Sequence, residues 1–133
     1  MSTNYYWQGK EFVPCPRCGN PSPPDPIHIG LSAVGWCFKL QVIPELNIHD
    51  LSDWKRKWQE PGEIKDQYGR ILTPAQMSAL IEERKGGGPL PAYSWLVDNG
   101  AVVGPNGLVR ERLSHHCIGH GEGTWDLIEG EFS

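Results

Sequence analysis

The sequence predicts an α+β fold in which a small antiparallel sheet carries two short helices and a zinc-ribbon-like site joins the N-terminal and C-terminal segments. A run of β-branched and aromatic residues over 34–43 is typical of a strand. Two segments with capping residues and apolar stripes, 50–59 and 73–85, predict helices. Two short motifs have the spacing of zinc ligands, Cys15-x-x-Cys18 and Cys117-x-x-His120.

The length and composition favour one folded domain. A chain of 133 residues is long enough to bury one modest core but short for two. Six Trp, four Tyr and three Phe supply bulky core material, while 16 Gly and 12 Pro indicate many turns and ordered loops. We therefore expect residues 1–133 to form a single zinc-stabilised domain.

The charge and the apolar pattern limit the surroundings in which the chain can work. A formal charge of −4 argues against broad electrostatic attachment to nucleic acid or anionic lipid. No stretch approaches the roughly 20 apolar residues of a membrane helix, and residues 1–7 lack the pattern of a signal peptide. We expect a soluble cytoplasmic protein whose four cysteines are thiols or metal ligands, not disulfides.

The first third of the chain predicts a hairpin, a loop and a strand. Residues 5–7 and 11–13 flank Gln8-Gly9-Lys10 and are expected to pair with each other. Four prolines within 20–26 predict a stiff surface loop. The strand over 34–43 follows, with Cys37 as a packed or edge thiol.

The middle of the chain carries the two helices. Asp50 can cap the first, whose apolar stripe is Leu51, Trp54 and Trp58. A short strand at Ile64 and a turn at 68–70 precede the second.

The second helix begins with the capping box Thr73-Pro74-Ala75-Gln76. Met77, Leu80 and Ile81 form its buried stripe, and 86–89 ends it. Beyond it, a turn at 105–107 separates the apolar segments 101–103 and 108–113. A final strand is expected over 124–128.

The cysteine and histidine motifs predict one structural zinc ion. A thiolate pair in one tight turn can direct both sulfurs at a single ion, and zinc prefers four nitrogen or sulfur ligands. The preferred ligands are Cys15, Cys18, Cys117 and His120. Any of three histidines can replace one of them: His28, His115 or His116.

Two other interpretations of these motifs stay open. In one, Cys15 and Cys18 are small buried residues and the histidine cluster is a surface loop. In the other, the zinc is catalytic and keeps an open water position, which four good ligands disfavour.

Four segments carry a resemblance that spans most of the chain: Cys15 to Cys18, His28 to Trp36, Tyr68 to Arg70 and Cys117 to Asp126. On these motifs the chain resembles a family of small, mostly uncharacterised bacteriophage and prophage proteins. The resemblance implies a phage-encoded protein working in the host cytoplasm and brings no established reaction. Leu31 departs from the lysine typical of the family at this position, which puts a phosphate-binding role of the 28–36 loop in doubt.

Three classes of function remain, and a protein-interaction module that modulates a host or defence complex is preferred. Its partner is expected to be a host or phage protein, since nothing in the sequence demands catalysis. The second class is a zinc-ribbon nucleic-acid-binding protein that uses basic residues such as Lys55, Arg56 and Lys57. The third is a small hydrolase or nuclease in which a histidine pairs with a carboxylate such as Asp126 or Glu122. The sequence does not predict the oligomeric state.

Overall fold

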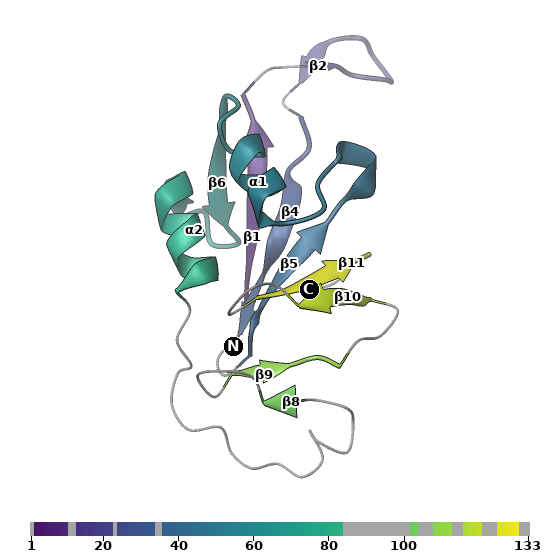
Figure 1. Cartoon of the computed structure of the whole chain (residues 1–133). Coiled ribbons are helices and arrows are strands. Elements are labelled where there is room, and N and C mark those ends of the chain that lie inside the picture. Colours follow the sequence, from purple (N-terminus) through teal and green to yellow (C-terminus); the bar gives the residue numbers. More distant parts are fainter. Residues whose placement is uncertain are drawn as a thin grey trace.

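The computed structural model describes residues 2–10, 13–22, 24–33, 36–83, 102–103, 108–112, 116–120 and 125–130. They form a seven-stranded, mostly antiparallel sheet with two helices, which confirms the α+β class (Figure 1).

The strand order of the large sheet is β10-β11-β5-β4-β1-β6-β7. Every neighbouring pair is antiparallel except β11 and β5, which run parallel. The bounds are β1 Ser2–Gly9, β4 Ile27–Ala33, β5 Phe38–Val42, β6 Gly62–Asp66, β7 Ile71–Leu72, β10 Cys117–His120 and β11 Trp125–Glu129. Two small ladders join β2 (Val13–Pro14) to β3 (Pro21–Ser22), and β8 (Val102–Val103) to β9 (Val109–Arg110).

Both helices begin as their capping residues predict. Helix α1 (Leu51–Lys57) follows a short 3-10 helix at Pro44–Leu46, and the Asp50 side chain accepts a hydrogen bond from the Asp53 N–H at 3.0 Å. Helix α2 (Pro74–Glu82) starts with a complete capping box between Thr73 and Gln76. These caps satisfy N–H groups that the first turn of a helix leaves without partners.

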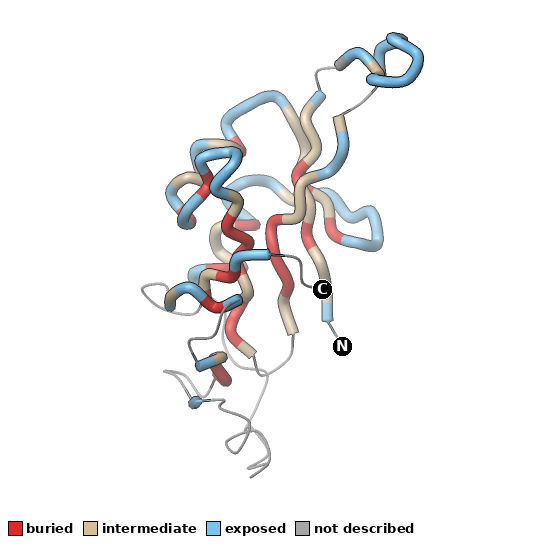
Figure 2. The backbone as a smooth tube through the Cα atoms, turned by 90° about the vertical axis from the view of Figure 1, so that its right-hand side faces the viewer, coloured by how far each residue is buried: buried red, intermediate tan, exposed pale blue. Residues whose placement is uncertain are grey.

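The two helices cover one face of the sheet and enclose the main core (Figure 1). Trp54 lies at its centre with no exposed surface, and its indole N–H donates to the Gln41 carbonyl at 2.8 Å. The residues that form this core are large and apolar: Tyr5, Trp7, Ile29, Phe38, Leu40, Ile48, Leu51, Trp54, Trp58, Ile64, Met77 and Ile81. Figure 2 shows how this buried interior contrasts with the exposed loops.

Gly30 allows β4 to pass directly over this core. A Cβ atom at this position would overlap the Lys39 carbonyl oxygen and the Phe38 ring. The segment around Gly30 was expected to be a polar loop, and that prediction is wrong because it forms β4. The glycine serves close packing between strands, not a turn.

The expected N-terminal hairpin is also wrong. Residues 5–7 pair with β4 on one side and β6 on the other, so neither edge of β1 is free for 11–13. Local turn chemistry favoured the hairpin, but partners far along the chain bury Tyr5 and Trp7 more completely.

In the C-terminal part, the paired β8 and β9 and the final strand β11 are confirmed. The residues of the predicted glycine-rich helix end (86–89) and of the turn at 105–107 lie outside the described residues. Residues 117–120 form strand β10, where a zinc-binding turn was expected. Within the described ranges, no helix is long and apolar enough to cross a membrane.

Candidate metal site

An irregularity in β10 places Cys117 and His120 on the same face of the sheet. Residues three apart in a regular strand point to opposite faces. The register with β11 shifts between Cys117 and Gly119, so Cys117 lies opposite Ile128 while His120 lies opposite Asp126. One extra residue in β10 is therefore accommodated, as in a β-bulge.

Asp126 completes a group of three side chains that could hold a metal ion. One ligand atom each from Cys117, His120 and Asp126 lies within 4.8 Å of the others. Cys117 and Asp126 are 1% exposed, whereas the His120 side chain is 32% exposed. Among the described residues this is the only such group of Cys, His, Asp and Glu side chains.

The Asp126 carboxylate accepts more hydrogen bonds than any other group of the site. It accepts hydrogen bonds from Arg110 Nη1 at 3.1 Å and from the Glu111 N–H at 3.3 Å. His120 Nδ1 lies 2.6 Å from Asp126 Oδ1 and donates to it. Because a buried carboxylate is costly without partners, these contacts explain how a charge is kept in the interior.

The surroundings of Cys117 favour the neutral thiol. Its Sγ donates weakly to the Gly119 carbonyl at 3.7 Å and lies 4.0 Å from the Glu111 carbonyl. Burial and the nearby negative charge of Asp126 raise the pKa of the Cys117 thiol. A buried, protonated thiol is a poor nucleophile, so the proximity of Cys, His and Asp does not by itself favour covalent catalysis.

The structure does not bring Cys15 and Cys18 to Cys117 and His120. The first pair lies in the turn between β2 and β3, at the end of the molecule away from β10 (Figure 1). No metal-ligand group among the described residues combines the two pairs. The four-ligand site stays a prediction, and the group that the described residues form contains two of its members, Cys117 and His120, together with Asp126.

Cys15 differs from Cys117 in its surroundings. It is half-buried, its neighbour Cys18 is exposed, and both are free thiols. Backbone N–H groups of Cys18 and Arg17, together with the Cys18 side chain, lower the pKa of the Cys15 thiol. Main-chain donors aimed at sulfur favour the thiolate, which is the form that binds metals.

The histidines that were considered as alternative ligands are dispersed. His28 lies in β4, where Nε2 is 2.8 Å from Asn4 Oδ1 and Nδ1 is 3.2 Å from Gln41 Oε1. Burial lowers the pKa of His28, partly offset by the contact with Gln41. His116 precedes Cys117 and its ring approaches Gly130, and His115 lies outside the described residues.

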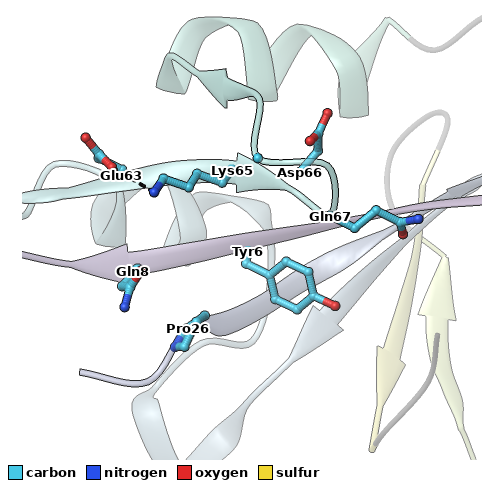
Figure 3. A pocket seen from close by; sticks show the side chains of 8 residues that line it. Tyr6, Gln8, Pro26, Glu63, Lys65, Asp66 and Gln67 are labelled. Atoms are coloured by element: carbon cyan, nitrogen blue, oxygen red, sulfur yellow. Dashed lines mark ion pairs between the residues drawn. The ribbon is translucent and has the colours of Figure 1, made fainter. Parts of the chain in front are cut away.

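A groove of about 470 Å³ lies on the sheet face away from the helices (Figure 3). Tyr6 and Gln8 of β1 and Glu63 and Lys65 of β6 contribute to its walls, as does Pro26. Glu63 and Lys65 form an ion pair across 3.5 Å. The groove does not include any residue of the candidate metal site, so the two features are separate surfaces.

The sequence indicated Asp126 only as a carboxylate that could pair with a histidine in a hydrolase or nuclease, not as a metal ligand, and it indicated no role for Arg110. One signal was present, because Asp126 is a charged residue within the apolar strand pattern Trp125-Asp126-Leu127-Ile128. A charge on the buried side of a strand requires a partner.

Comparisons with known proteins do not add to this picture: no protein-family model matches the chain, and no curated protein and no solved structure matches it.

Proposed function

We propose that the protein is a zinc-stabilised protein-interaction module. The observation that carries the metal assignment is the convergence of Cys117, His120 and Asp126 at the bulge of β10. The ion fixes the C-terminal strands, and a separate surface binds a partner protein.

The donor set favours zinc. A thiolate and an imidazole are ligands that zinc accepts and that magnesium and calcium disfavour, and a carboxylate oxygen is compatible with all three ions. His120 Nδ1 and Asp126 Oδ1 are joined by a hydrogen bond of 2.6 Å, and a cation bound to both atoms would replace its proton and move the two side chains slightly apart. The burial of Cys117 and Asp126 fits a structural ion.

Measurement of zinc content tests this assignment by comparing variants of two buried cysteines, Cys117 and Cys37. In a chain carrying Cys15→Ser and Cys18→Ser, we expect about one zinc ion per chain. Adding Cys117→Ser to this chain should abolish zinc binding. Adding Cys37→Ser instead is the matched control, because Cys37 is also buried, at 2% exposure. Equal zinc content in the Cys117→Ser and Cys37→Ser proteins would contradict the proposal.

The edge of the sheet at β7 supports the interaction assignment. Tyr68 is 66% exposed and Ile71 is 60% exposed, the largest values among the exposed large hydrophobic residues described. The neighbouring residues Gln67 and Gly69 line the groove of Figure 3. Exposed apolar side chains beside a groove at an open strand edge are typical of a protein-binding surface.

The basic residues of α1 favour a protein partner over nucleic acid. Lys55 pairs with Glu82 at 2.8 Å, and Arg56 pairs with Asp53. Lys57 lies 3.2 Å from Glu60 and above the Trp7 ring. Because nearby carboxylates offset these charges, α1 does not offer the concentrated basic face that phosphate binding requires.

A binding experiment with matched surface variants tests this half of the proposal. The resemblance to phage proteins makes a bacterial lysate the source of partners. We expect saturable capture of one protein by the wild type, and at least a tenfold loss of affinity in Tyr68→Asp/Ile71→Asp. Leu46→Asp is the control, because Leu46 is 45% exposed on the distant 3-10 helix. Equal loss in both variants, or no saturable capture, would count against it.

A further inference from the structure

Backbone hydrogen bonds close the turn that carries Cys15 and Cys18. The short β2–β3 ladder pairs Pro14 with Pro21, and the Cys15 N–H donates to the Asn20 carbonyl at 2.9 Å. The Gly19 N–H returns to the Cys15 carbonyl at 2.8 Å, and Gly19 adopts a φ of +73°. This left-handed residue closes the turn with both cysteines on it.

Within the part of the chain that the structure describes, the two thiols have too few partners for a complete metal site. Zinc prefers four ligands, and no third Cys, His, Asp or Glu ligand atom joins this pair among the described residues. The chain has four cysteines, and the other two are buried elsewhere, Cys37 at 2% and Cys117 at 1% exposure. The pair thus resembles half of a tetrahedral site.

We propose that Cys15 and Cys18 form one half of a zinc site that the same pair from a second copy of this chain completes. Four thiols release their protons to solvent, and four zinc–sulfur bonds of about 2.3 Å replace them. The bound species is a zinc tetrathiolate on a twofold axis, and the protein associates as a zinc-linked dimer.

The position of the hairpin suits a contact between two copies. It extends from the end of the sheet and is exposed over its tip, so two tips can meet without contact between the sheets (Figure 2). A twofold arrangement needs only one kind of surface, and each copy supplies half of the ligands. No heterologous partner is required to fill the coordination sphere.

Charge also favours this arrangement. A zinc ion with four thiolates retains roughly two negative charges. Arg17 lies between the two cysteines and is exposed, so a dimer brings two guanidinium groups to the site. Their charge offsets that of the tetrathiolate.

Sedimentation velocity with zinc, combined with metal analysis, tests the inference on the full chain. We expect the metal-free protein to be monomeric and the zinc-loaded protein to be dimeric, with about one zinc ion per two chains at this site. Cys15→Ser/Cys18→Ser should stay monomeric with zinc. Cys37→Ser is the control and should dimerise like the wild type.

The Cys117→Ser variant separates this inference from the proposed function, on which it does not depend. That variant should lose the other metal yet still dimerise with zinc. Three results would overturn the inference: a zinc-loaded monomer that retains the ion at Cys15 and Cys18, zinc-dependent dimers that survive Cys15→Ser/Cys18→Ser, or a Cys15–Cys18 disulfide under reducing conditions. Cobalt in place of zinc provides a second readout, since tetrathiolate cobalt has its own visible spectrum and Cys15→Ser should alter it.

Discussion

The helix-covered part of the sheet and its C-terminal end are held together by different forces. Strands β1, β4, β5 and β6 bury large apolar side chains beneath α1 and α2. At the C-terminal end, by contrast, the buried residues include the Arg110–Asp126 ion pair, with side chains 10% and 2% exposed. A network of this kind depends on every partner, whereas an apolar core tolerates exchange of similar residues.

This difference indicates where a bound metal ion would affect stability. The main core does not involve any of the candidate ligands, so its stability comes from apolar burial. Strands β10 and β11 instead carry charged and thiol groups, and an ion bound by these groups would contribute directly to the stability of the two strands. The two regions should consequently fail under different perturbations.

The largest effect is expected for Gly30→Val, which breaks the helix-covered part. Branched carbons at this position overlap the Lys39 backbone and the Phe38 ring, and the strands must separate to accept them. We expect loss of cooperative unfolding in calorimetry. Gly119→Ala is the control in the other region, where a Cβ meets only Leu127 at 3.9 Å. Similar melting of both variants would contradict this account.

The second largest loss of stability is expected for Asp126→Ala, which removes one partner of the buried ion pair in the C-terminal part of the structure. It leaves Arg110 buried without its carboxylate, and removal of one partner of a buried ion pair costs about 3–5 kcal/mol. Denaturant titration measures the loss. Replacing both partners, with Arg110→Met and Asp126→Leu, should restore much of it. A double variant as unstable as the single one would show that the ion pair is not the cause.

A smaller effect is expected at the start of α2. Thr73→Ala removes the side-chain oxygen that accepts the Gln76 N–H at 3.1 Å, and we expect a loss of about 1 kcal/mol in the free energy of unfolding. Ser78→Ala lies within the same helix and serves as the control. The metal content should be unchanged in both variants, which would show that the stability of α2 and metal binding at β10 are independent.

The smallest effect concerns pH. The folded-state pKa of His28 lies below its usual 6.5, so the unfolded chain takes up a proton first as the pH falls. The stability contributed by neutral His28 is present above about pH 6.5 and is lost as the pH falls from there towards the folded-state pKa. We expect the free energy of unfolding to change by less than about 1 kcal/mol, because His28 is partly exposed and solvent screens its charge. His28→Gln should flatten the pH dependence of urea midpoints between about pH 7.5 and pH 5.5, which is about one unit either side of the pKa of an ordinary histidine. An unchanged slope would exclude His28 as the cause.

The sequence predicted the elements whose signals are local. Asp50 and the Thr73–Gln76 box fixed the starts of both helices, and the alternation of Phe38, Leu40 and Val42 predicted the central strand. These features depend on interactions within a few residues, which a single sequence displays directly.

The elements that were missed depend on distant partners. Strand β4 contains His28 and Gly30, which suggest a loop until Phe38 is known to pack against Gly30. The site was predicted in part, since Cys117 and His120 belong to the described group. The sequence indicated its third member, Asp126, only as a possible partner of a histidine, because its place beside Cys117 depends on the register that the bulge of β10 sets with β11.

The parallel pairing of β11 with β5 has a consequence for biosynthesis. Trp125 is matched with Phe38 and Glu129 with Val42, so one side of β5 stays uncovered until residues far downstream leave the ribosome. Contacts of such long sequence separation slow folding, and an unpaired strand edge invites association with other chains. The nascent protein should therefore benefit from a chaperone that shields this edge during translation.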